Sequence, residues 1–407
     1  MKDLWLSKKA ISKHRLAKDK YCTGCLACKD ACRHEAISVV LKNGMPFPKV
    51  NTDKCVECKL CEKVCPVVSG ICRNEVSEEV AYGGWIKDAN TREKTASGGA
   101  FAALAKDFLE NHSYGIVVGA SLKDNHVRHI CIDNVDNLDL LLNSKYVQSR
   151  TDGIFRQVIE YLKEGRQVLF SGLPCQVAGL YGYIGKRETL KKNLWTIDLI
   201  CHGVASQEAL DLHLQYYHAD KILAFRKKDA FKQYGTSQCT TLLVDNNEMT
   251  IDRRHDIFYN IFASWLTDRK SCHDCKFARL ERVADITIGD FWSKKGCSDK
   301  GVSLILANNL HGQKLVKETR NLHVWRATMR EAIDCNANLW MGWKATKWHP
   351  MVVWPVGCKR ILPSKLRIDI LARRSFWLLT WAPYKLITIW YIKFAKKIIL
   401  KKYKDVL

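Results

Sequence analysis

The sequence predicts a mixed α+β and α/β fold with three parts: a cysteine-rich N-terminal module, a central α/β domain and a basic, aromatic C-terminal tail. Three observations predict it. The 407 residues include 18 cysteines, and eight of them lie in two short runs before residue 66. Between residues 97 and 290, helix-like and strand-like segments alternate, which is typical of a sheet covered by helices. Residues 359–407 hold 13 Lys and Arg but only 2 Asp and Glu. We therefore expect domains at 1–75, 76–335 and 336–407.

The overall composition fits a globular protein of two or three domains. Hydrophobic residues make up 47% of the chain and charged residues 26%, which are ordinary values. The N-terminus lacks the apolar core of a secretory signal peptide, and the cysteine spacing favours metal binding over a disulfide framework. We therefore expect a cytoplasmic protein. The net charge of +23 suits nucleic acid, anionic lipid or an acidic redox partner, and charge alone does not choose among them.

Two segments near the N-terminus repeat one cysteine pattern. Each has the spacing Cys-x2-Cys-x2-Cys-x3-Cys, and a proline follows the second run. This is the run of bacterial two-cluster ferredoxins, in which the fourth cysteine of each run binds the cluster of the other. Zinc is the alternative, but zinc sites usually use two Cys-x2-Cys pairs. We predict one [4Fe–4S] cluster on Cys22, Cys25, Cys28 and Cys65, and a second on Cys55, Cys58, Cys61 and Cys32.

The segment between the two runs has the pattern of a small β-hairpin. Residues 36–54 contain a Lys-Asn-Gly turn between two strand-like stretches. Arg33 follows Cys32 where a proline is usual in such runs, which predicts a looser corner there. A charged linker around Arg73–Glu79 then leads into the central domain.

The central domain is predicted from its alternating helices and strands. A Ser-Gly-Gly turn precedes a helix within Thr95–Asn111. The backbone N–H groups of this turn suit an anion such as a flavin or nucleotide phosphate, and the alternative is a plain tight turn. The remaining predicted elements are a strand at 114–122, a helix near Gly153–Gly165, a strand at Val168–Phe170, a helix from Gln176, a strand at Leu194–Ile200 and a strand ending at Gly289-Asp290.

Four cysteines of the central domain suggest a further site. Cys175 and Cys201 follow the carboxyl ends of two predicted strands, which is the edge where open α/β sheets bind ligands. Together with Cys272 and Cys275, they could hold a third [4Fe–4S] cluster. The alternatives are a redox disulfide at Cys272 and Cys275, a zinc site, or buried structural thiols. Six further cysteines have no partner spacing and are interpreted as structural: Cys72, Cys131, Cys239, Cys297, Cys335 and Cys358.

Six ordered motifs of the central domain resemble one protein family. They are ASGGAF, SKYVQS at Ser144–Ser149, SGLPCQ, DLICHGVAS, CHDC…ADITIGDFW and KGVSLIL. Their order and spacing are similar to those of the beta-subunit family of coenzyme F420 hydrogenases and dehydrogenases, which also includes 7-hydroxymethyl chlorophyll a reductase. The resemblance spans about residues 80–335, with a ferredoxin module fused in front as in many members. Two positions depart from the pattern: Ala205 replaces a proline, and Ser293 replaces a glycine.

The resemblance implies an FAD-binding α/β domain with its own iron–sulfur cluster. It favours the third cluster on the four cysteines above and implies that Cys175 is a ligand. Lys145 would offset charge on the flavin phosphate or at N1–C2=O, and Gln148 would hydrogen-bond the ring. The residues implied near the flavin, or in the loop beside Cys175, are Ser97, Gly98, Gly99, Ser144, Lys145, Tyr146, Gln148, Ser149, Gly172, Pro174 and Gln176.

We interpret the chain as an iron–sulfur flavoprotein oxidoreductase that passes electrons between [4Fe–4S] clusters and FAD, and on to or from an organic substrate that the sequence does not identify. Its other partner would be a redox protein or a reduced cofactor. Members with this fused ferredoxin occur where coenzyme F420 is not expected, often beside functions in cell-surface polysaccharide biosynthesis. The alternative is a flavin-free electron-relay subunit. His202, next to Cys201, is either a proton donor or a structural histidine.

The C-terminal extension combines aromatic and basic residues. Residues 375–392 are mostly apolar, but Pro383 and Lys385 interrupt them, so a membrane span is disfavoured. Its Trp and Tyr side chains and the basic residues that follow favour peripheral contact with the inner face of the cell membrane. The alternative is a helix packed on its own domain or on a partner. Because the basic charge gathers beside lipid-type aromatics, nucleic acid is not an expected ligand.

Overall fold

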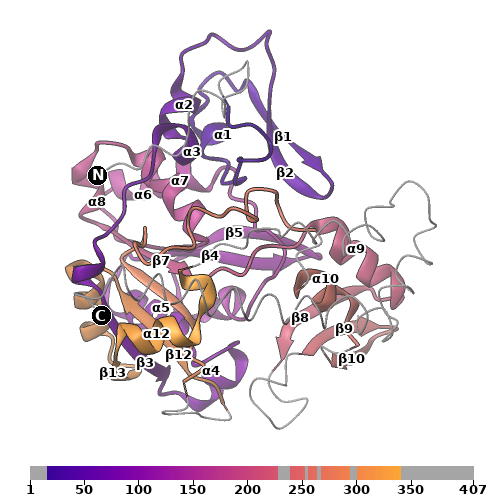
Figure 1. Cartoon of the computed structure of the whole chain (residues 1–407), viewed down its shortest axis with the longest axis vertical. Helices are drawn as coiled ribbons and strands as arrows, with labels where there is room; N and C mark the ends of the chain where they lie inside the picture. The colour runs from indigo at the N-terminus through magenta and orange to yellow at the C-terminus, as the bar shows by residue number, and fades with distance from the viewer. Residues whose placement is uncertain (1–15, 228–238, 253–254, 264–266, 294–299, 341–407) are drawn as a thin grey trace.

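The molecule consists of a small cysteine-rich module that projects from a larger α/β body (Figure 1). The computed structural model describes residues 16–227, 239–252, 255–263, 267–293 and 300–340. Residues 16–69 form the module at the top of the view, and most of the others belong to one large sheet and its helices. The predicted mixed α+β and α/β class is therefore confirmed. The predicted tail lies almost entirely outside the described residues.

The N-terminal module contains a β-hairpin and three short helices joined by cysteine-bearing loops. β1 (Ile37–Lys42) and β2 (Met45–Val50) pair antiparallel. The turn residues Asn43 and Gly44 have φ angles of 53° and 71°, and a two-residue hairpin favours Asn-Gly because it needs positive φ at both positions. The predicted hairpin is confirmed. The helices are α1 (Ala27–Ala31), α2 (Leu60–Val64) and α3 (Pro66–Ser69).

Eight strands form the central sheet in the order β13-β3-β12-β11-β7-β6-β4-β5. The middle of the sheet, from β4 through β6 and β7 to β11, is parallel, and the outer strands pair antiparallel. Parallel pairing needs crossover connections, and the alternating strands and helices of the sequence supply them. The strands are β3 (Val80–Ile86), β4 (Ile116–Lys123), β5 (His126–Ile132), β6 (Val168–Gly172), β7 (Leu194–Leu199), β11 (Ile286–Asp290), β12 (Ser303–Ala307) and β13 (Leu322–Ala327).

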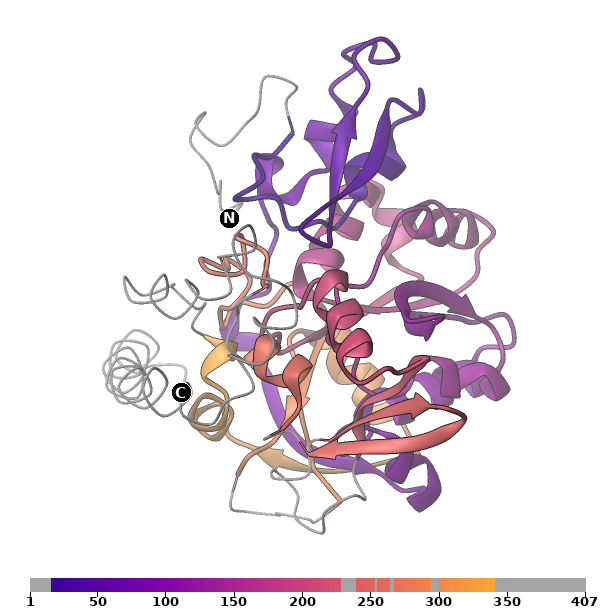
Figure 2. The same cartoon turned by 90° about the vertical axis from the view of Figure 1, so that its right-hand side faces the viewer.

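Helices cover both faces of the sheet, because alternate residues of a strand point to opposite faces. Val117 of β4 shares a core with α5 (Ala100–Asn111), whereas Ile116 and Val118 share the opposite core with α6 (Ile154–Lys163) and α7 (Pro174–Ile184). The cysteine-rich module rests on the α6 and α7 layer (Figure 2). The other helical elements are α4 (Ala89–Lys94), α8 (Glu188–Lys191), α11 (Leu310–Glu318), α12 (Met329–Cys335), η2 (Val76–Glu78), η3 (Val135–Leu141) and η4 (Ala337–Leu339).

A smaller three-stranded sheet, which the sequence analysis does not predict, lies beside the large one (Figure 1). β8 (Lys221–Lys227), β9 (Cys239–Val244) and β10 (Asn247–Asp252) pair antiparallel in the order β10-β9-β8. α9 (Gln207–Tyr216) and α10 (Ile257–Ala263) share one hydrophobic core with these strands. We call this unit the lateral subdomain.

Among the residues that the structure describes, no helix is both long and apolar enough to cross a membrane. The segment predicted to contact lipid, residues 375–392, falls outside them. Its contact with a membrane stays a prediction.

Candidate functional site

The N-terminal module gathers eight thiols into two groups. Burial raises the pKa of Cys65, and the thiols of Cys25 and Cys22 add to the effect; at Cys28 the next causes after burial are Cys65, Cys25 and Cys22, followed by Cys61. The other four cysteines line a separate cavity of about 80 Å³. Each group therefore joins three cysteines of one run to the fourth of the other, as the two-cluster pattern requires. We call Cys22, Cys25, Cys28 and Cys65 the inner set, and Cys32, Cys55, Cys58 and Cys61 the outer set.

The two loops that each carry three cysteines share one backbone conformation. Gly24 and Leu26 have positive φ, and so do Glu57 and Lys59 at the equivalent positions of the second run. Positive φ is uncommon outside glycine and costs free energy. α1 and α2 begin directly after these loops. The recurrence of these strained positions indicates that both loops wrap their thiols around the same kind of group.

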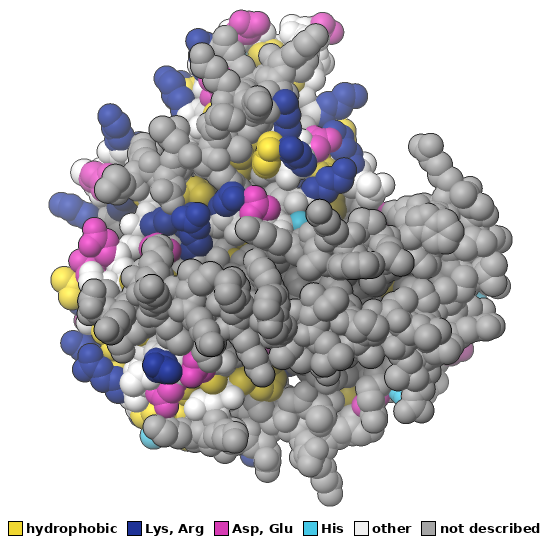
Figure 3. Space-filling model, in the orientation of Figure 1, with side chains coloured by type: hydrophobic (Ala, Val, Ile, Leu, Met, Phe, Trp, Pro, Cys, Tyr) yellow, Lys and Arg dark blue, Asp and Glu magenta, His cyan; other side chains and the backbone are white. Residues whose placement is uncertain are grey.

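The two sets differ in exposure. Cys22, Cys25 and Cys28 are buried, whereas Cys55 and Cys58 lie in the loop 51–59, in which every residue is exposed. This loop carries two acidic and two basic side chains. Figure 3 likewise shows both signs of charge over the upper part of the molecule. The outer set is therefore the one that a partner molecule could approach from solvent.

The four remaining predicted ligands come together at a second small cavity. Cys175 lies in the first turn of α7, Cys201 follows β7, and Cys272 and Cys275 lie in the loop before β11. All four line a cavity of about 40 Å³, and each is half-buried. Burial is the main cause that raises the pKa of Cys272. Asp268 raises it further, and so do the other three thiols. We call these four cysteines the third set.

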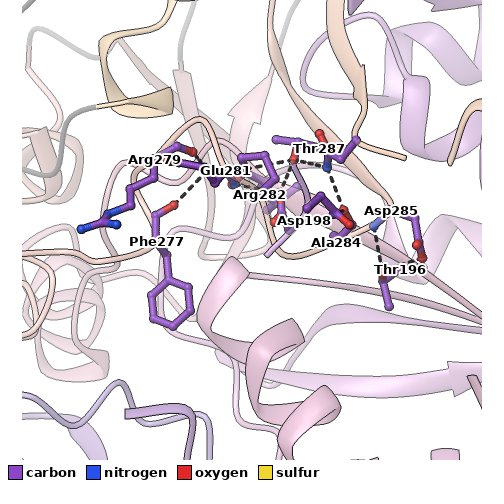
Figure 4. Close-up of polar contacts among 12 residues, drawn as sticks. Thr196, Asp198, Phe277, Arg279, Glu281, Arg282, Ala284, Asp285 and Thr287 are labelled. Carbon is purple, nitrogen blue, oxygen red and sulfur yellow. Dashed lines mark hydrogen bonds and ion pairs between the residues drawn. The ribbon is translucent and has the colours of Figure 1, made fainter. Parts of the chain in front are cut away.

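A buried arginine fastens the loop before β11 to the sheet (Figure 4). Arg282 is 1% exposed and pairs with Asp198 on β7, with 2.8 Å between Nη2 and Oδ1. It also donates to the Phe277 carbonyl oxygen at 3.0 Å and to Thr287 Oγ1 on β11 at 3.0 Å. The five donors of a guanidinium suit such a multiple attachment. The loop that carries two cysteines of the third set is thereby held at the end of β7.

The charged segment Arg73–Glu79, predicted as a linker, is fixed to the same loop. Asn74 N–H donates to the Arg282 carbonyl oxygen at 2.8 Å. Arg73 donates to two further carbonyl oxygens of the loop, at 3.1 Å and 2.7 Å. The composition of the segment suggested a free connection, but its arginine and asparagine find buried backbone acceptors. The chain that leaves the module is therefore part of the framework around the third set.

The inner set lies against the third set. A Cβ atom on Gly179 of α7 would stand 2.9 Å from the Cys25 sulfur. Burial raises the pKa of Cys175, and the thiols of Cys201, Cys275 and then Cys25 add to the effect. Thr23, in the loop of the inner set, lines the third-set cavity. α7 therefore carries a third-set thiol at its start and contacts an inner-set thiol one turn later.

Donor type and spacing fit iron–sulfur clusters at these sets. All three consist of cysteines alone, and thiolates suit iron–sulfur clusters and zinc. Within the described part of the chain, no three His, Cys, Asp or Glu side chains converge closely enough to hold a single metal ion. A cubane cluster carries its four thiolates on four different irons, so its ligands stand wider apart than those of one ion.

A larger cavity of about 490 Å³ lies on the other side of Cys201, which lines both cavities. Its volume falls in the usual range of cofactor sites, about 300–1,000 Å³. The ends of β6, β7 and β11 reach it, at the carboxyl edge where α/β sheets bind ligands. The predicted flavin residues that line it are Ser97, Gly99, Ser144, Lys145, Tyr146, Ser149, Gly172 and Gln176.

Two residues of the predicted flavin site lie elsewhere. A Cβ on Gly98 would stand 2.4 Å from the Gly84 oxygen and 2.5 Å from the Ser303 nitrogen, so this glycine serves close backbone packing. Gln148 lines the smaller third-set cavity. Its Nε2 donates to a carbonyl oxygen of the inner-set loop at 2.9 Å, and its Oε1 accepts from Arg269. The structure thus places Gln148 between the module and the α/β body, and we leave it out of the proposed flavin contacts.

The Ser-Gly-Gly turn leads into a helix whose start lines the large cavity. α5 begins at Ala100, directly after Gly99 with a φ of 80°. The N-cap residue supplies no side-chain cap, and the Ala100 N–H donates to Ser303 Oγ at 3.3 Å. A helix N-terminus carries partial positive charge and free N–H donors, which favour an anion. The predicted helix is confirmed, and the chemistry of this edge fits the phosphate of a nucleotide-type cofactor.

Two basic side chains, the half-buried Lys145 and the buried His129, also line the large cavity. Burial lowers the pKa of Lys145 to about 7, and its Nζ donates to the Leu142 oxygen at 2.5 Å. Burial is likewise the main cause that lowers the pKa of His129 to about 4. His129 Nδ1 lies 2.7 Å from Ser149 Oγ, and Nε2 lies 3.0 Å from the Ser171 oxygen. A neutral ring that donates from Nε2 satisfies both contacts.

His202 forms part of the same wall. This residue is exposed, so solvent reaches it at the cavity. The two roles considered for it, proton donor and structural histidine, both stay predictions.

The sequence analysis missed the part of the wall that the lateral subdomain supplies. Arg226 on β8 pairs with Asp290 at the end of β11, with 2.9 Å between Nη1 and Oδ2. Tyr259 and Phe262 of α10 and Trp292 also line the cavity. The motif ADITIGDFW contains Asp290 and Trp292 and was the signal for that edge. β8 and α10 carry no motif, so the other side chains become visible only in the tertiary structure.

Comparison with known proteins gives matches to two parts of the chain. The family model for the C terminus of the coenzyme F420 hydrogenase/dehydrogenase beta subunit matches residues 165–329, and a 4Fe-4S dicluster domain model matches residues 21–69. Ferredoxin YfhL of Escherichia coli (strain K12) is 34% identical over 74 residues, which are 17% of this chain and 81% of that protein. A chain from a xenon-derivatised F420-reducing [NiFe] hydrogenase complex of Methanosarcina barkeri is 14% identical, with a TM-score of 0.44. The match covers 66% of this chain and 90% of that one.

Proposed function

Because the chain belongs to the coenzyme F420 hydrogenase/dehydrogenase beta-subunit family and carries a 4Fe-4S dicluster domain at its N-terminus, we propose that it is an iron–sulfur flavoprotein oxidoreductase. An iron–sulfur role in electron transfer follows from the family and the dicluster domain. The proposal adds a third [4Fe–4S] cluster, FAD and an organic substrate. It also adds a redox protein or reduced cofactor that exchanges electrons at the outer set. A place in cell-surface polysaccharide biosynthesis stays a sequence-based hypothesis.

The observation that carries the proposal is the continuous row formed by the three thiol sets and the large cavity. The outer and inner sets interlock through their exchanged fourth cysteines, Cys32 and Cys65. Cys25 of the inner set contacts α7, which begins with Cys175 of the third set. Cys201 lines both the third-set cavity and the large cavity. The row therefore runs from an exposed loop to a pocket that can hold a substrate.

The third set offers what a [4Fe–4S] cluster needs. Cys175, Cys201, Cys272 and Cys275 would supply four thiolates from three separate loops. Arg282 donates to the Phe277 oxygen in the loop before β11 and to the Leu199 oxygen at the end of β7, and so holds these two segments together. Its guanidinium lines the cavity. That positive charge favours thiolate ligands: it is among the causes that lower the pKa of Cys201 and Cys275 against the effect of burial.

The large cavity offers a polar edge and an apolar wall. Ser97, Gly99 and the start of α5 would hold a flavin phosphate, and Lys145 would offset its charge. A bound flavin supplies the exchange between two-electron hydride steps and one-electron steps. On the wall from the lateral subdomain, Tyr259 and Phe262 would exclude water and contact the organic substrate.

The flavin and iron content of the anaerobically purified protein tests this proposal. We expect about one FAD and about 12 iron atoms per chain, as three [4Fe–4S] clusters require. The FAD is identified by chromatography after denaturation. In the variant Gly119→Leu, a side chain should fill the large cavity, because a Cβ on Gly119 meets only ordinary contacts at 3.4 Å and beyond. We expect this variant to lose most of its flavin and to keep its iron.

The control variant is Gly165→Ala, because Gly165 lies in a turn where an added Cβ would meet no other atom within 4 Å. It should keep both cofactors. Full iron without flavin in the wild type would identify the chain as a relay subunit and move the chemistry to its partner. About eight iron atoms per chain would remove the third cluster from the proposal.

A further inference from the structure

Arg269 occupies the space between the inner-set loop and the loop of the third set. Its side chain is 2% exposed, and its guanidinium stacks on Phe47, 4.3 Å from the ring centroid. Gly24 makes room for it: a Cβ there would stand 2.4 Å from Arg269 Nη2. Along the chain, Arg269 accepts a hydrogen bond from the Cys272 N–H at 2.8 Å through its own carbonyl oxygen. Arg269 therefore belongs to the third-set loop by its backbone and reaches the inner-set loop with its guanidinium.

The hydrogen bonds of Arg269 all end on uncharged acceptors. Nε and Nη2 donate to Gln148 Oε1 at 2.9 Å and 2.8 Å. Nη2 also donates to the Pro46 oxygen at 2.6 Å, and Nη1 to the Cys22 oxygen at 3.4 Å. No carboxylate of the described residues pairs with it. Its positive charge is therefore uncompensated at close range, in a place that water does not reach.

Arg282 makes a useful contrast. It is as deeply buried and lines the third-set cavity, but it forms an ion pair with Asp198 at 2.8 Å. A nearby carboxylate cancels much of the field that a guanidinium exerts on its surroundings. Arg269 is thus the buried cation that acts on the thiol sets without such cancellation in the described structure.

The effect of Arg269 reaches both sets. Burial raises the pKa of Cys22, and the charge of Arg269 is the largest opposing cause. The same charge opposes burial at Cys25 and at Cys175. The charge of Arg269 is not among the main causes that shift the pKa of Cys61 in the outer set. Burial is the largest cause there, and Glu62, Cys58 and Cys55 also contribute. Arg269 therefore stabilises negative charge on Cys22, Cys25 and Cys175, whereas Asp268 acts in the opposite direction at Cys201 and Cys272.

We propose that Arg269 is a positioning residue for electron transfer, and that its uncompensated charge raises the reduction potentials of the clusters on the inner and third sets. Reduction adds one electron to a cluster, with no bond formed or broken and no proton taken up. A nearby cation therefore stabilises the reduced form, and burial strengthens the effect. Electrons would then be held on the inner side of the row, next to the large cavity. The inference rests on the proposed function, because it assumes clusters on both sets.

Three variants separate charge from packing. Arg269→Gln removes the charge, and Arg269→Lys keeps it with fewer hydrogen bonds. Gln148→Glu puts a carboxylate against Nε and Nη2 of Arg269 and so cancels its charge, and it also removes the donation from Nε2 to the Thr23 oxygen. The matched control is Arg156→Gln. Arg156 also donates to carbonyl oxygens of the module, those of Asp30 and Cys32, at 2.7 Å and 3.0 Å, but it does not line the third-set cavity.

The measurement is an anaerobic redox titration of the iron-loaded full chain, followed by electron paramagnetic resonance. In Arg269→Gln and Gln148→Glu we expect the potentials of the inner and third clusters to shift to more negative values, and that of the outer cluster to stay. In Arg269→Lys and Arg156→Gln the inner and third potentials should stay close to wild type. Iron content is measured on every sample.

The proposal is overturned if Gln148→Glu holds full iron and leaves all potentials unchanged. It is also overturned if Arg269→Lys shifts the inner and third potentials as far as Arg269→Gln does, because packing would then be the cause. If Arg269→Gln does not fold, the reduction potentials of Gln148→Glu still test the proposal. A wild-type protein with about eight iron atoms per chain would instead contradict the proposed function, because the third cluster would be missing. Iron content therefore distinguishes failure of the proposed function from failure of the inference about Arg269.

Discussion

Three carbonyl groups of the inner-set loop are each held by a side chain from the α/β body. The Cys22 oxygen accepts from Ser271 at 3.0 Å, the Thr23 oxygen from Gln148 at 2.9 Å and the Cys25 oxygen from Thr151 at 2.8 Å. All three donors are buried. Buried carbonyls without partners would cost about 1–3 kcal/mol each. The loop therefore has one favourable position on the body, and this fixes the inner set relative to the third.

At the same scale, His129 should make stability depend on pH. Its pKa is about 4 in the folded protein and about 6.5 in the unfolded chain. The unfolded state therefore binds this proton first, so stability falls as the pH drops from about 6.5 towards 4, by about 2 kcal/mol at pH 5. In His129→Gln we expect the unfolding free energy to fall less between pH 7 and pH 5 than in the wild type, as measured by anaerobic chemical unfolding.

The control for this prediction is His126→Gln, at the exposed start of β5. Its pH profile should run parallel to that of the wild type. Identical slopes for His129→Gln and the wild type would show that the ring is not held neutral in the folded state.

Single residues were predictable where chemistry fixes their spacing. Cysteine spacing pointed to the members of the inner and outer sets, because a cluster ligand must recur at set intervals along a loop. The third set was suggested by two strand ends, one Cys-x2-Cys pair and the family resemblance. Arg269 and His129 have no such pattern, since each works through neighbours 20 or more residues away in the chain. Ala205 replaces a proline of the family pattern, and its N–H donates to the Tyr146 oxygen at 2.8 Å, a bond that proline lacks.

Among the elements, α7 has the largest part in joining the module to the body. Pro174 occupies its first turn, so Cys175 follows directly at the end of β6. Gly179 and Gly182 lie on the side that faces the module: a Cβ on Gly182 would stand 2.2 Å from the Val64 oxygen. Both glycines thus allow the backbone of α7 to approach the module closely.

We expect Gly182→Ala to loosen this contact. The added methyl group meets backbone and cannot be accommodated by a side-chain rotation, so the module should shift, at a cost of about 1–3 kcal/mol. A lower denaturant midpoint and faster cleavage between module and body in limited proteolysis would measure this. Gly165→Ala serves as the control, because only its positive φ opposes the substitution, by about 1 kcal/mol. Equal proteolysis of both variants would contradict the close approach.

Elements with clear periodicity were predictable, and those defined by distant pairing were not. The predicted helix near Gly153–Gly165 and the strand at Leu194–Ile200 appear as α6 and β7. The lateral subdomain was missed, because its short antiparallel strands carry no alternation strong enough to stand out. The apolar side chains of its strands are buried against α9 and α10, and this contact forms only in the tertiary structure.

For the molecule as a whole, the row of sites predicts that loss of the third cluster interrupts electron transfer between the outer set and the flavin. In Cys175→Ser we expect iron to fall by about a third, flavin to stay, and reduction of the flavin from the outer set to slow at least tenfold. Iron analysis and stopped-flow absorbance with a one-electron protein donor measure this. Cys131→Ser is the matched control, since Cys131 lies on β5 outside all three sets. Fast flavin reduction in an iron-depleted Cys175→Ser would contradict the row.

The row itself could not be read from the sequence. Spacing within each run fixes which thiols share a cluster, but the distance between sets depends on how α7 docks against the module and on the strand order of the sheet. The large cavity depends equally on the lateral subdomain, which comes from a different stretch of the chain. Tertiary packing alone decides both.

The position of β3 has a consequence for biosynthesis. It is the first strand of the large sheet to leave the ribosome, yet it pairs only with β12 and β13, the last two. At about 5–20 residues per second, roughly 10–40 s of translation separate β3 from β12. Cys275 is made before either partner strand. All three thiol sets are therefore complete in the nascent chain before the sheet around them can close.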